Sequence, residues 1–255
     1  MVQTNRTILI TGATSGIGKA CAQKFASAGD NVIINGRRAD RLADLKNALI
    51  KDFNIKVYET VFDVQNREDV FAAVNSLPEE WKSIDVLVNN AGLALGRDHF
   101  DEADLDDWET MLQTNVNGLL YVTKAVLPFM IKRKNGHIIN LGSVAGKDMY
   151  EKGNVYCASK AAVDVISKTL RIDLLQHRIK VTAIHPGAVE TEFALVRFKG
   201  DAGKAADTYK GFIPLTAADV AETIFYTASL PPHVCINDIV ITALAQANAV
   251  YFKKD

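Results

Sequence analysis

A tyrosine and a lysine four positions apart are the residues of this sequence best suited to chemistry. Tyr156 and Lys160 lie in a segment with helical periodicity, where side chains four apart leave the same face of the helix. A phenol ordinarily titrates near pH ~10, but a neighbouring ammonium favours the phenolate. Tyr156 is therefore a candidate for proton transfer near neutral pH. This spacing is common in exposed helices, so the rest of the sequence must supply the context.

A glycine-rich segment at residues 12–18 lies between the first predicted strand and the first predicted helix. Its glycines permit a tight turn, so that N–H groups at the start of the helix can approach the pyrophosphate of a dinucleotide. The spacing is GxxxGxG rather than GxGxxG, and an ordinary glycine-rich turn is the alternative. The residues expected to contact the cofactor here are Gly12, Thr14, Ser15, Gly16, Ile17 and Gly18.

Two arginines stand where an NAD-binding fold usually carries an acidic residue, about 20 positions after the glycines. The sequence at the end of the second predicted strand is Asn35-Gly36-Arg37-Arg38. Guanidinium groups favour the 2′-phosphate of NADP through charge-assisted hydrogen bonds, and no carboxylate is present there to repel it. We expect NADP as the cofactor; a solvated arginine pair is the alternative.

Predicted strands and helices alternate along the whole chain. Most strands are continuous apolar runs, as expected where helices cover both faces of a parallel sheet. The pattern predicts one α/β Rossmann domain over residues 1–255, with a doubly wound, seven-stranded parallel sheet. The strand candidates are residues 7–11, 31–35, 56–61, 84–88, 137–141, 180–184 and 236–242. The helix candidates are residues 16–28, 40–52, 67–77, 105–133, 155–177 and 217–229.

Polar and small residues follow the third and fourth predicted strands, at the carboxyl edge where open α/β sheets bind ligands. Asp63 and Val64 could hold the adenine, through a carboxylate hydrogen bond and an apolar contact. In the segment Asn89-Asn90-Ala91-Gly92, small side chains allow close approach of the cofactor, and we expect contacts from Asn89, Ala91 and Gly92. An ordinary turn is the alternative.

Several motifs occur together in one order: the glycine-rich segment, the Asn89–Gly92 segment, the tetrad Asn115, Ser143, Tyr156 and Lys160, and His185-Pro186-Gly187. On these motifs the chain resembles the short-chain dehydrogenase/reductase family from residue 7 to about residue 242. The resemblance implies that Tyr156 is the general acid or base and that Ser143 hydrogen-bonds the substrate oxygen. It implies further that Lys160 binds the nicotinamide ribose and lowers the tyrosine pKa. Asn115 would support a proton-relay water.

These implied roles suit hydride transfer, because an alkoxide needs a hydrogen-bond donor and a proton. Taken alone, Ser143 could be a loop serine and Asn115 a polar helix residue. The same resemblance implies cofactor contacts from Tyr156, Lys160, Pro186, Gly187, Val189 and Thr191.

A narrower resemblance is visible in residues 89–96, 153–156, 189–193 and 196–201. These segments are similar to the NADP-dependent 3-hydroxy acid dehydrogenases that oxidise serine and allo-threonine, and the likeness implies activity on 3-hydroxypropionate and malonic semialdehyde. The alternatives are a reductase of another carbonyl substrate, such as a 3-oxoacyl compound or a sugar, and a non-catalytic NADP(H) sensor. A sensor would be expected to lack Tyr156 or Lys160, and both are present.

The longest segment without a predicted strand is residues 188–214, and a loop of this length in a compact domain is often a lid. Arg197 is the candidate substrate residue in it, because a guanidinium can bind a carboxylate through two parallel hydrogen bonds. A solvated cation on a mobile surface loop is the alternative.

Composition narrows the choice of partner and compartment. The net charge of −1 gives no electrostatic reason to expect nucleic acid or an anionic membrane. No segment is long and apolar enough for a signal peptide or a membrane span, and three cysteines cannot all pair. We expect a cytoplasmic enzyme with a small-molecule substrate and no metal. Apolar residues on the 105–133 and 155–177 helices, which pair between subunits in the family that the chain resembles, predict a homotetramer.

Overall fold

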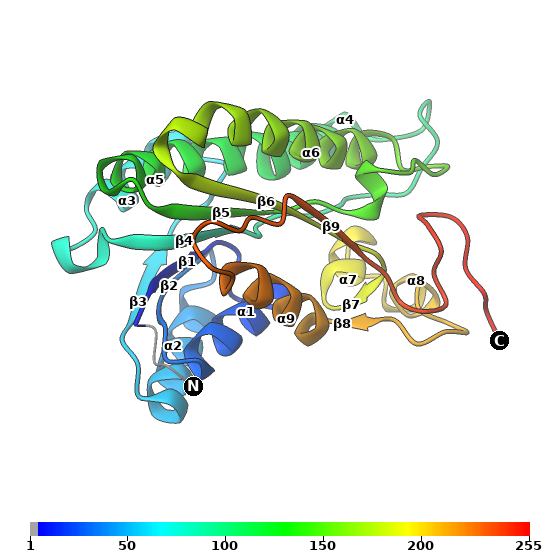
Figure 1. Ribbon diagram of the computed structural model, residues 1–255. Coiled ribbons are helices and arrows are strands. Elements are labelled where there is room, and N and C mark those ends of the chain that lie inside the picture. Colours follow the sequence, from blue (N-terminus) through cyan, green and yellow to red (C-terminus); the bar gives the residue numbers. More distant parts are fainter. Residues whose placement is uncertain (1–4) are drawn as a thin grey trace.

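The fold is organised by a parallel sheet whose strand order is β3-β2-β1-β4-β5-β6-β9. The computed structural model describes residues 5–255 (Figure 1). All seven predicted strands are confirmed, and every neighbouring pair in the sheet is parallel. The strands are β1 (Thr7–Ile10), β2 (Asn31–Gly36), β3 (Val57–Val61), β4 (Ile84–Asn89), β5 (Gly136–Leu141), β6 (Ile179–Pro186) and β9 (Asp238–Ile241).

Helices cover both faces of the sheet, so the predicted doubly wound arrangement is confirmed. In Figure 1 one layer lies above the sheet and the other below it. The upper layer contains α3 (Arg67–Asn75), α4 (Leu105–Leu112), α5 (Leu119–Arg133) and α6 (Asn154–Leu174). The lower layer contains α1 (Gly16–Ser27), α2 (Ala39–Phe53) and α9 (Ala217–Ala228).

The apolar strands are buried on both faces, which explains their continuous hydrophobic runs. Successive residues of β1 point to opposite faces: Ile8 and Ile10 belong to the core beneath the sheet, and Leu9 belongs to the core above it. All three side chains are fully buried. Parallel strands of this kind end at a common carboxyl edge, and the loops at that edge form the site.

Two stretches differ from the sequence prediction. The helix predicted over residues 105–133 is interrupted by a π-helical turn, Gln113–Gly118, between α4 and α5. Residues 188–214, predicted to lack a strand, contain the short strand β7 (Val189–Glu190), which pairs in parallel with β8 (Leu215–Thr216). The strand prediction failed there because two residues are too few to give a periodic pattern.

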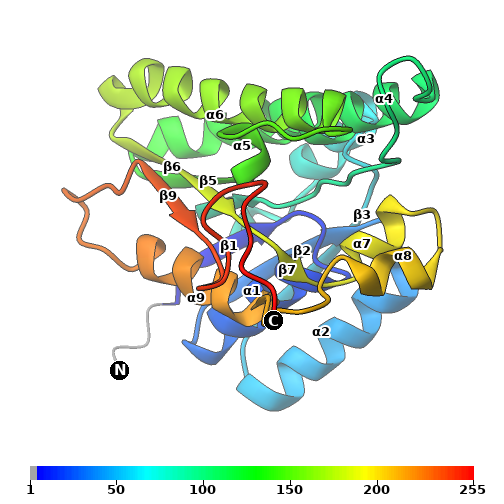
Figure 2. The same cartoon turned by 90° about the vertical axis from the view of Figure 1, so that its right-hand side faces the viewer.

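The segment 188–214 is called the lid below. Besides β7 it contains the helices α7 (Phe193–Arg197) and α8 (Ala202–Asp207). Figure 2 shows α7 and α8 side by side, next to β7. None of the helices in residues 5–255 combines the length and the apolarity needed to cross a bilayer.

Candidate active site

A cleft of about 340 Å³ opens at the carboxyl edge of the sheet. This volume lies at the lower end of the range for small-molecule sites. The cleft runs from the glycine-rich turn and the arginines after β2 to Ser143, Tyr156 and Lys160. Most of the predicted site residues therefore lie along one continuous surface. The further predicted residues that line it are Thr14, Ser15, Ile17, Asp63, Val64, Ala91, Gly92, Pro186, Gly187, Val189 and Thr191.

The turn between β1 and α1 is shaped to receive a phosphate group. Gly12 and Gly16 have φ angles of +67° and +51°, a region that favours glycine. A Cβ atom on Gly12 would lie 3.0 Å from the Cα of Ala91, and one on Gly16 would lie 3.3 Å from Thr191. Ser15, the N-cap of α1, makes no side-chain capping hydrogen bond. The first N–H groups of α1 are thus available to an anion, as in dinucleotide sites.

Arg38 lies at the rim of this turn and connects it to the lid. Its guanidinium donates hydrogen bonds to the hydroxyls of Thr14 at 2.6 Å and Ser15 at 3.1 Å. It also pairs with Glu192 of the lid at 3.2 Å. Arg37 is more exposed and pairs with Asp63 at 3.3 Å. Both guanidinium groups line the cleft, where a 2′-phosphate could accept hydrogen bonds from them.

Tyr156 lies near the start of α6 and is 8% exposed. Burial raises the pKa of its phenol, and a hydrogen bond from Ser143 and the charge of Arg197 act in the opposite direction. Ser143 is itself fixed, because its Oγ caps the following 3₁₀ turn by accepting a hydrogen bond from the backbone N–H of Ala145 at 3.1 Å. The hydroxyl that lowers the tyrosine pKa is therefore held by the loop after β5.

Lys160 and Asn115 meet at Gly92. A Cβ atom on Gly92 would lie 3.1 Å from Asn115 Oδ1 and 3.4 Å from Lys160 Nζ. Burial lowers the pKa of Lys160 to about 8, and its ammonium donates a hydrogen bond to the carbonyl of Leu141 at 2.8 Å. Ser143, Tyr156, Lys160 and Gly92 thus line one end of the cleft, and Asn115 lies behind Gly92 without lining it.

Asn115 lies within the π-helical turn between α4 and α5, a feature that is frequent at functional sites. Its Oδ1 accepts a hydrogen bond from the N–H of Leu93, and its Nδ2 donates to the carbonyl of Leu93, each at 2.8 Å. Nδ2 also donates to Ser159 Oγ at 3.0 Å. The amide of Asn115 therefore connects the segment after β4 to the catalytic helix.

Arg197, the predicted substrate residue, ends α7 beside Tyr156 but is not among the residues that line the cleft. The centre of its guanidinium lies 5.5 Å from the ring centroids of both Tyr150 and Tyr156. Its Nε donates a hydrogen bond to the carbonyl of Gly96 at 3.2 Å, and the N–H of Gly96 donates to the carbonyl of Arg197 at 3.0 Å. Phe193 packs on Tyr156 with ring centroids 5.7 Å apart. An arginine and an aromatic ring thus border the phenol of Tyr156.

Two predicted cofactor residues do not line the cleft. Gly18 packs under the glycine turn, where a Cβ atom would lie 2.3 Å from the carbonyl oxygen of Gly12. The amide of Asn89 is buried and donates hydrogen bonds to Thr123 and Asn140. Gly18 allows close packing and Asn89 connects β4 to its neighbours, so both act one layer behind the cleft surface.

Sequence reasoning also missed residues that the fold brings to the site. Thr114, Glu192 and Phe193 line the cleft, and Arg97 lies 5.7 Å from the ring of Tyr150. None of them belongs to a spaced motif, although Glu192 immediately follows the predicted contact Thr191. Glu192 and Phe193 reach the cleft because the lid folds back over the sheet.

Comparisons with known proteins agree with this geometry. Residues 6–201 match the family model described as short chain dehydrogenase. The chain is 47% identical to the NADP-dependent 3-hydroxy acid dehydrogenase YdfG of Escherichia coli K12, over 95% of this chain and 96% of the relative. It is 46% identical to sulfoacetaldehyde reductase 2 of Chromohalobacter salexigens, over 94% and 95% of the two chains.

A solved structure of a dehydrogenase also has the fold of this chain. The closed form of a serine dehydrogenase complexed with NADP⁺ superposes with a TM-score of 0.92 at 46% identity, covering 98% of this chain and 99% of the other. The family match spans more than half of the chain and includes Tyr156 and Lys160. This chain belongs to the short-chain dehydrogenase family.

Proposed function

We propose that this protein is an NADP-dependent dehydrogenase of small 3-hydroxy acids such as serine, allo-threonine and 3-hydroxypropionate. One observation carries the substrate assignment: the Arg197 guanidinium lies 5.5 Å from the ring of the catalytic Tyr156. A carboxylate paired with that guanidinium would place a hydroxyl two carbons away near the phenol. The names of the relatives, a 3-hydroxy acid dehydrogenase and a serine dehydrogenase, support the same substrate class.

The cofactor assignment rests on the arginines after β2 and on the N-terminus of α1. Arg37 and Arg38 line the cleft and would bind the 2′-phosphate, while the N–H groups of α1 would bind the pyrophosphate. Both arginines already pair with carboxylates, and a phosphate would compete for or share those hydrogen bonds. The NADP complex of the serine dehydrogenase supports this assignment.

In the oxidation direction, Tyr156 accepts the proton of the substrate hydroxyl while Ser143 donates a hydrogen bond to the substrate oxygen. Bound NADP supplies the hydride acceptor. Lys160, with a pKa near 8, remains mostly protonated at neutral pH. Its charge is not among the main causes that shift the pKa of Tyr156, so its expected effect on the phenol stays a prediction. Asn115 keeps the segment after β4 against α6, and Phe193 covers the catalytic phenol on the lid side.

A second candidate is reduction of sulfoacetaldehyde. The relative that carries this activity in its name is nearly as similar as the hydroxy acid dehydrogenase, at 46% identity. Arg97 and Arg197 both lie within 6 Å of Tyr150, and two guanidinium groups could share the three oxygens of a sulfonate.

A substrate panel tests the proposal. Production of NADPH would be followed with serine, allo-threonine, 3-hydroxypropionate, 3-hydroxybutyrate, isethionate and simple sugars, and each reaction would be repeated with NAD. We expect the highest kcat/KM with NADP and a 3-hydroxy acid. A clear preference for isethionate would favour the sulfonate candidate, and a preference for sugars would contradict both.

We also infer a homotetramer in the cytoplasm. Val165 and Ile172 of α6 are 57% and 74% exposed, and Leu105 at the start of α4 is 65% exposed. Covering these residues with a second copy would remove apolar surface from water. All three cysteines are free, which suits a reducing compartment. Light scattering that gave the mass of one chain at micromolar concentration would contradict the assembly.

A further inference from the structure

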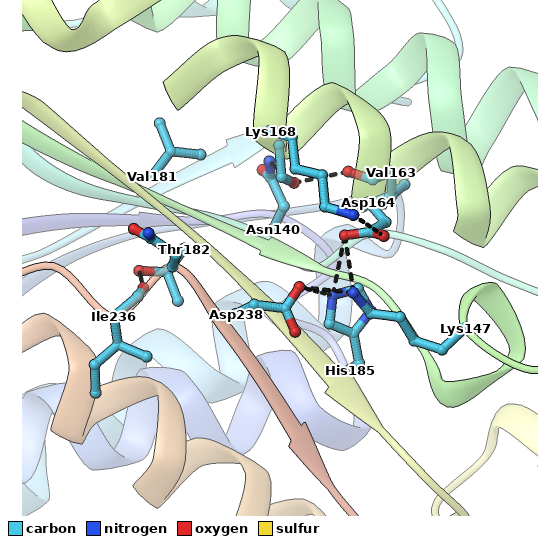
Figure 3. A network of polar contacts seen from close by, with 12 residues as sticks. Asn140, Lys147, Val163, Asp164, Lys168, Val181, Thr182, His185, Ile236 and Asp238 are labelled. Carbon is cyan, nitrogen blue, oxygen red and sulfur yellow. Dashed lines mark hydrogen bonds and ion pairs between the residues drawn. The ribbon is translucent and has the colours of Figure 1, made fainter. Parts of the chain in front are cut away.

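Four charged or titratable side chains, from three elements and the loop after β5, lie close together near the end of the cleft that Ser143 and Pro186 line. Figure 3 shows Lys147, Asp164 of α6, His185 of β6 and Asp238 of β9. The Lys147 ammonium lies 3.0 Å from Asp164 Oδ1 and 2.7 Å from Asp238 Oδ2. His185 Nε2 lies 3.2 Å from the same oxygen of Asp238. We call these four residues the Lys147 cluster.

Three members of the Lys147 cluster are close in sequence to residues of the active site. Lys147 follows Ser143 by four positions, and Asp164 follows Lys160 by one turn of α6. His185 immediately precedes Pro186, which lines the cleft. The cluster therefore connects the segments that carry the serine, the lysine and one wall of the cofactor site.

The segment 142–147, which carries Ser143, packs tightly on two of these elements. A Cβ atom on Gly142 would lie 2.3 Å from the Nδ1 atom of His185, and the N–H of Gly142 donates to the carbonyl of Ile184 at 2.7 Å. A Cβ atom on Gly146 would lie 2.5 Å from the backbone of Lys160. Glycines thus allow the serine segment to contact β6 and α6 directly, and Lys147 fixes its far end.

The cluster contains the three ligand atoms of a possible metal site, but an ammonium already lies among them. The atoms of Asp164, His185 and Asp238 lie within 4.8 Å of one another. Burial alone would lower the pKa of Lys147, but its hydrogen bonds to Asp238 and Asp164 outweigh burial and raise it. A lysine that stays protonated between two carboxylates supplies the positive charge that a metal ion would otherwise bring.

His185, the fourth member of the cluster, is buried and mainly uncharged. Its ring is fully buried, its Nε2 atom lies 3.2 Å from Asp238 Oδ2, and the ring also has a hydrogen bond with the backbone of Ser143. Burial lowers its pKa, although the charge of Asp238 opposes this effect. The ring therefore adds little charge of its own and fills the space beneath Gly142.

We propose that Lys147 is a positioning residue for Ser143, holding the serine segment against α6 and β9 through Asp164 and Asp238. Without the ammonium, the two carboxylates would face each other across a partly buried site with no cation between them, and they would repel. The segment would shift at its far end and carry Ser143 with it. This inference rests on the proposed use of Ser143 as the hydrogen-bond donor to the substrate oxygen.

The test compares two lysines that pair with the same carboxylate. Lys168 contacts Asp164 Oδ2 at 2.8 Å, but it lies on α6 itself and is largely exposed. Lys147→Met should lower kcat about tenfold to a hundredfold, since a misplacement near 1 Å can have that effect, with the Kd for NADP within about twofold. Lys168→Met removes the same charge and should keep kcat within about twofold. The substrate is whichever alcohol of the panel the unmodified enzyme oxidises fastest.

The pH profile separates positioning from general damage. Ser143 lowers the pKa of Tyr156, whose other neighbours are Tyr150, Cys157 and Arg197. If Lys147→Met displaces Ser143, the acidic limb of kcat/KM for oxidation should move to higher pH. Lys147→Arg keeps the positive charge and should restore most of kcat and the original profile.

A second variant changes Asp238, the member of the cluster that lies in β9. Asp238→Asn keeps Lys147 paired with Asp164 and should give a smaller loss of kcat with the same direction of pH shift. The proposal is overturned if Lys147→Met keeps kcat, or if it loses kcat and NADP affinity together without a pH shift. An unmodified enzyme that turns over no hydroxy acid would contradict the proposed function instead.

Discussion

The catalytic helix α6 and the lid place side chains beside the same substrate, but they are held very differently. Helix α6 has 21 residues and buries both Tyr156 and Lys160. The two lid helices have five and six residues, and together they bury a single side chain, Ala194. The proposed proton transfer thus depends on a packed element, and the proposed substrate recognition on one with little core.

Polar contacts compensate for the small core of the lid. Glu192 pairs with both Arg38 and Arg41, Lys199 pairs with Asp107 at 2.9 Å, and Arg197 exchanges hydrogen bonds with Gly96. Exposed ion pairs contribute little stability, so segments of this kind open at low cost. The lid should therefore open at lower cost than α6.

The largest effect is expected from a substitution in α6. Tyr156→Phe removes only the transferable proton, so kcat should fall by at least about 10²-fold while the Kd for NADP changes little. Steady-state kinetics and NADPH fluorescence titration measure the two quantities. Tyr226→Phe on the surface of α9 is the matched control and should have no effect. Activity above a few per cent in the Tyr156 variant would require another proton donor.

The free energy of unfolding of the protein should depend on pH through His137 in β5. Burial lowers the pKa of His137 to about 3, while the unfolded chain binds a proton near pH 6.5. Between these values the unfolded state binds more protons, so stability falls as the pH drops. From pH 7 to pH 5 this histidine should lower the unfolding free energy by about 2 kcal/mol.

Urea unfolding at the two pH values measures this change, and His137→Gln should reduce it. The exposed His233 provides the control, since His233→Gln should leave the pH dependence unchanged. A proton NMR titration that placed His137 near pH 6.5 in the folded protein would refute the prediction.

A smaller effect is expected where the lid meets the cofactor site. Arg38→Ala should weaken NADP binding roughly tenfold and hardly change NAD binding, because a charged hydrogen bond to phosphate typically contributes about 1.5–3 kcal/mol. Arg41→Ala removes a neighbouring guanidinium that pairs with Glu192 but does not line the cleft, and it should have a weaker effect on NADP. Equal kcat/KM for NADP and NAD in the unmodified enzyme would contradict the assignment.

How much the sequence predicts also differs between the packed sheet and helices and the lid. The seven strands and the glycine turn could be predicted because each depends on local periodicity or on spacing within one segment. Tyr156 and Lys160 could be found by their spacing, whereas Ser143 and Asn115 could be singled out only by the resemblance to a family. The lid could not be predicted, since its short strand pairs with residues 215 and 216, and the salt bridges that join it to the rest of the chain connect positions more than 90 residues apart. The Lys147 cluster was not predicted for the same reason, because its four members come together only when the loop after β5, β6, α6 and β9 are assembled.

The central claim is that α6 carries out proton transfer and that the lid recognises the substrate carboxylate. Its most direct test compares two substrates of the same size. The ratio of kcat/KM for 3-hydroxybutyrate to that for 3-hydroxybutyramide would be measured in the unmodified enzyme, in Arg197→Lys and in Tyr156→Phe. We predict that Arg197→Lys lowers the ratio severalfold, because a lysine cannot form two parallel hydrogen bonds with a carboxylate. Tyr156→Phe should lower kcat/KM for the acid and for the amide by the same factor and leave their ratio unchanged. An unchanged ratio in Arg197→Lys would show that the lid does not select the acid and that the carboxylate binds elsewhere.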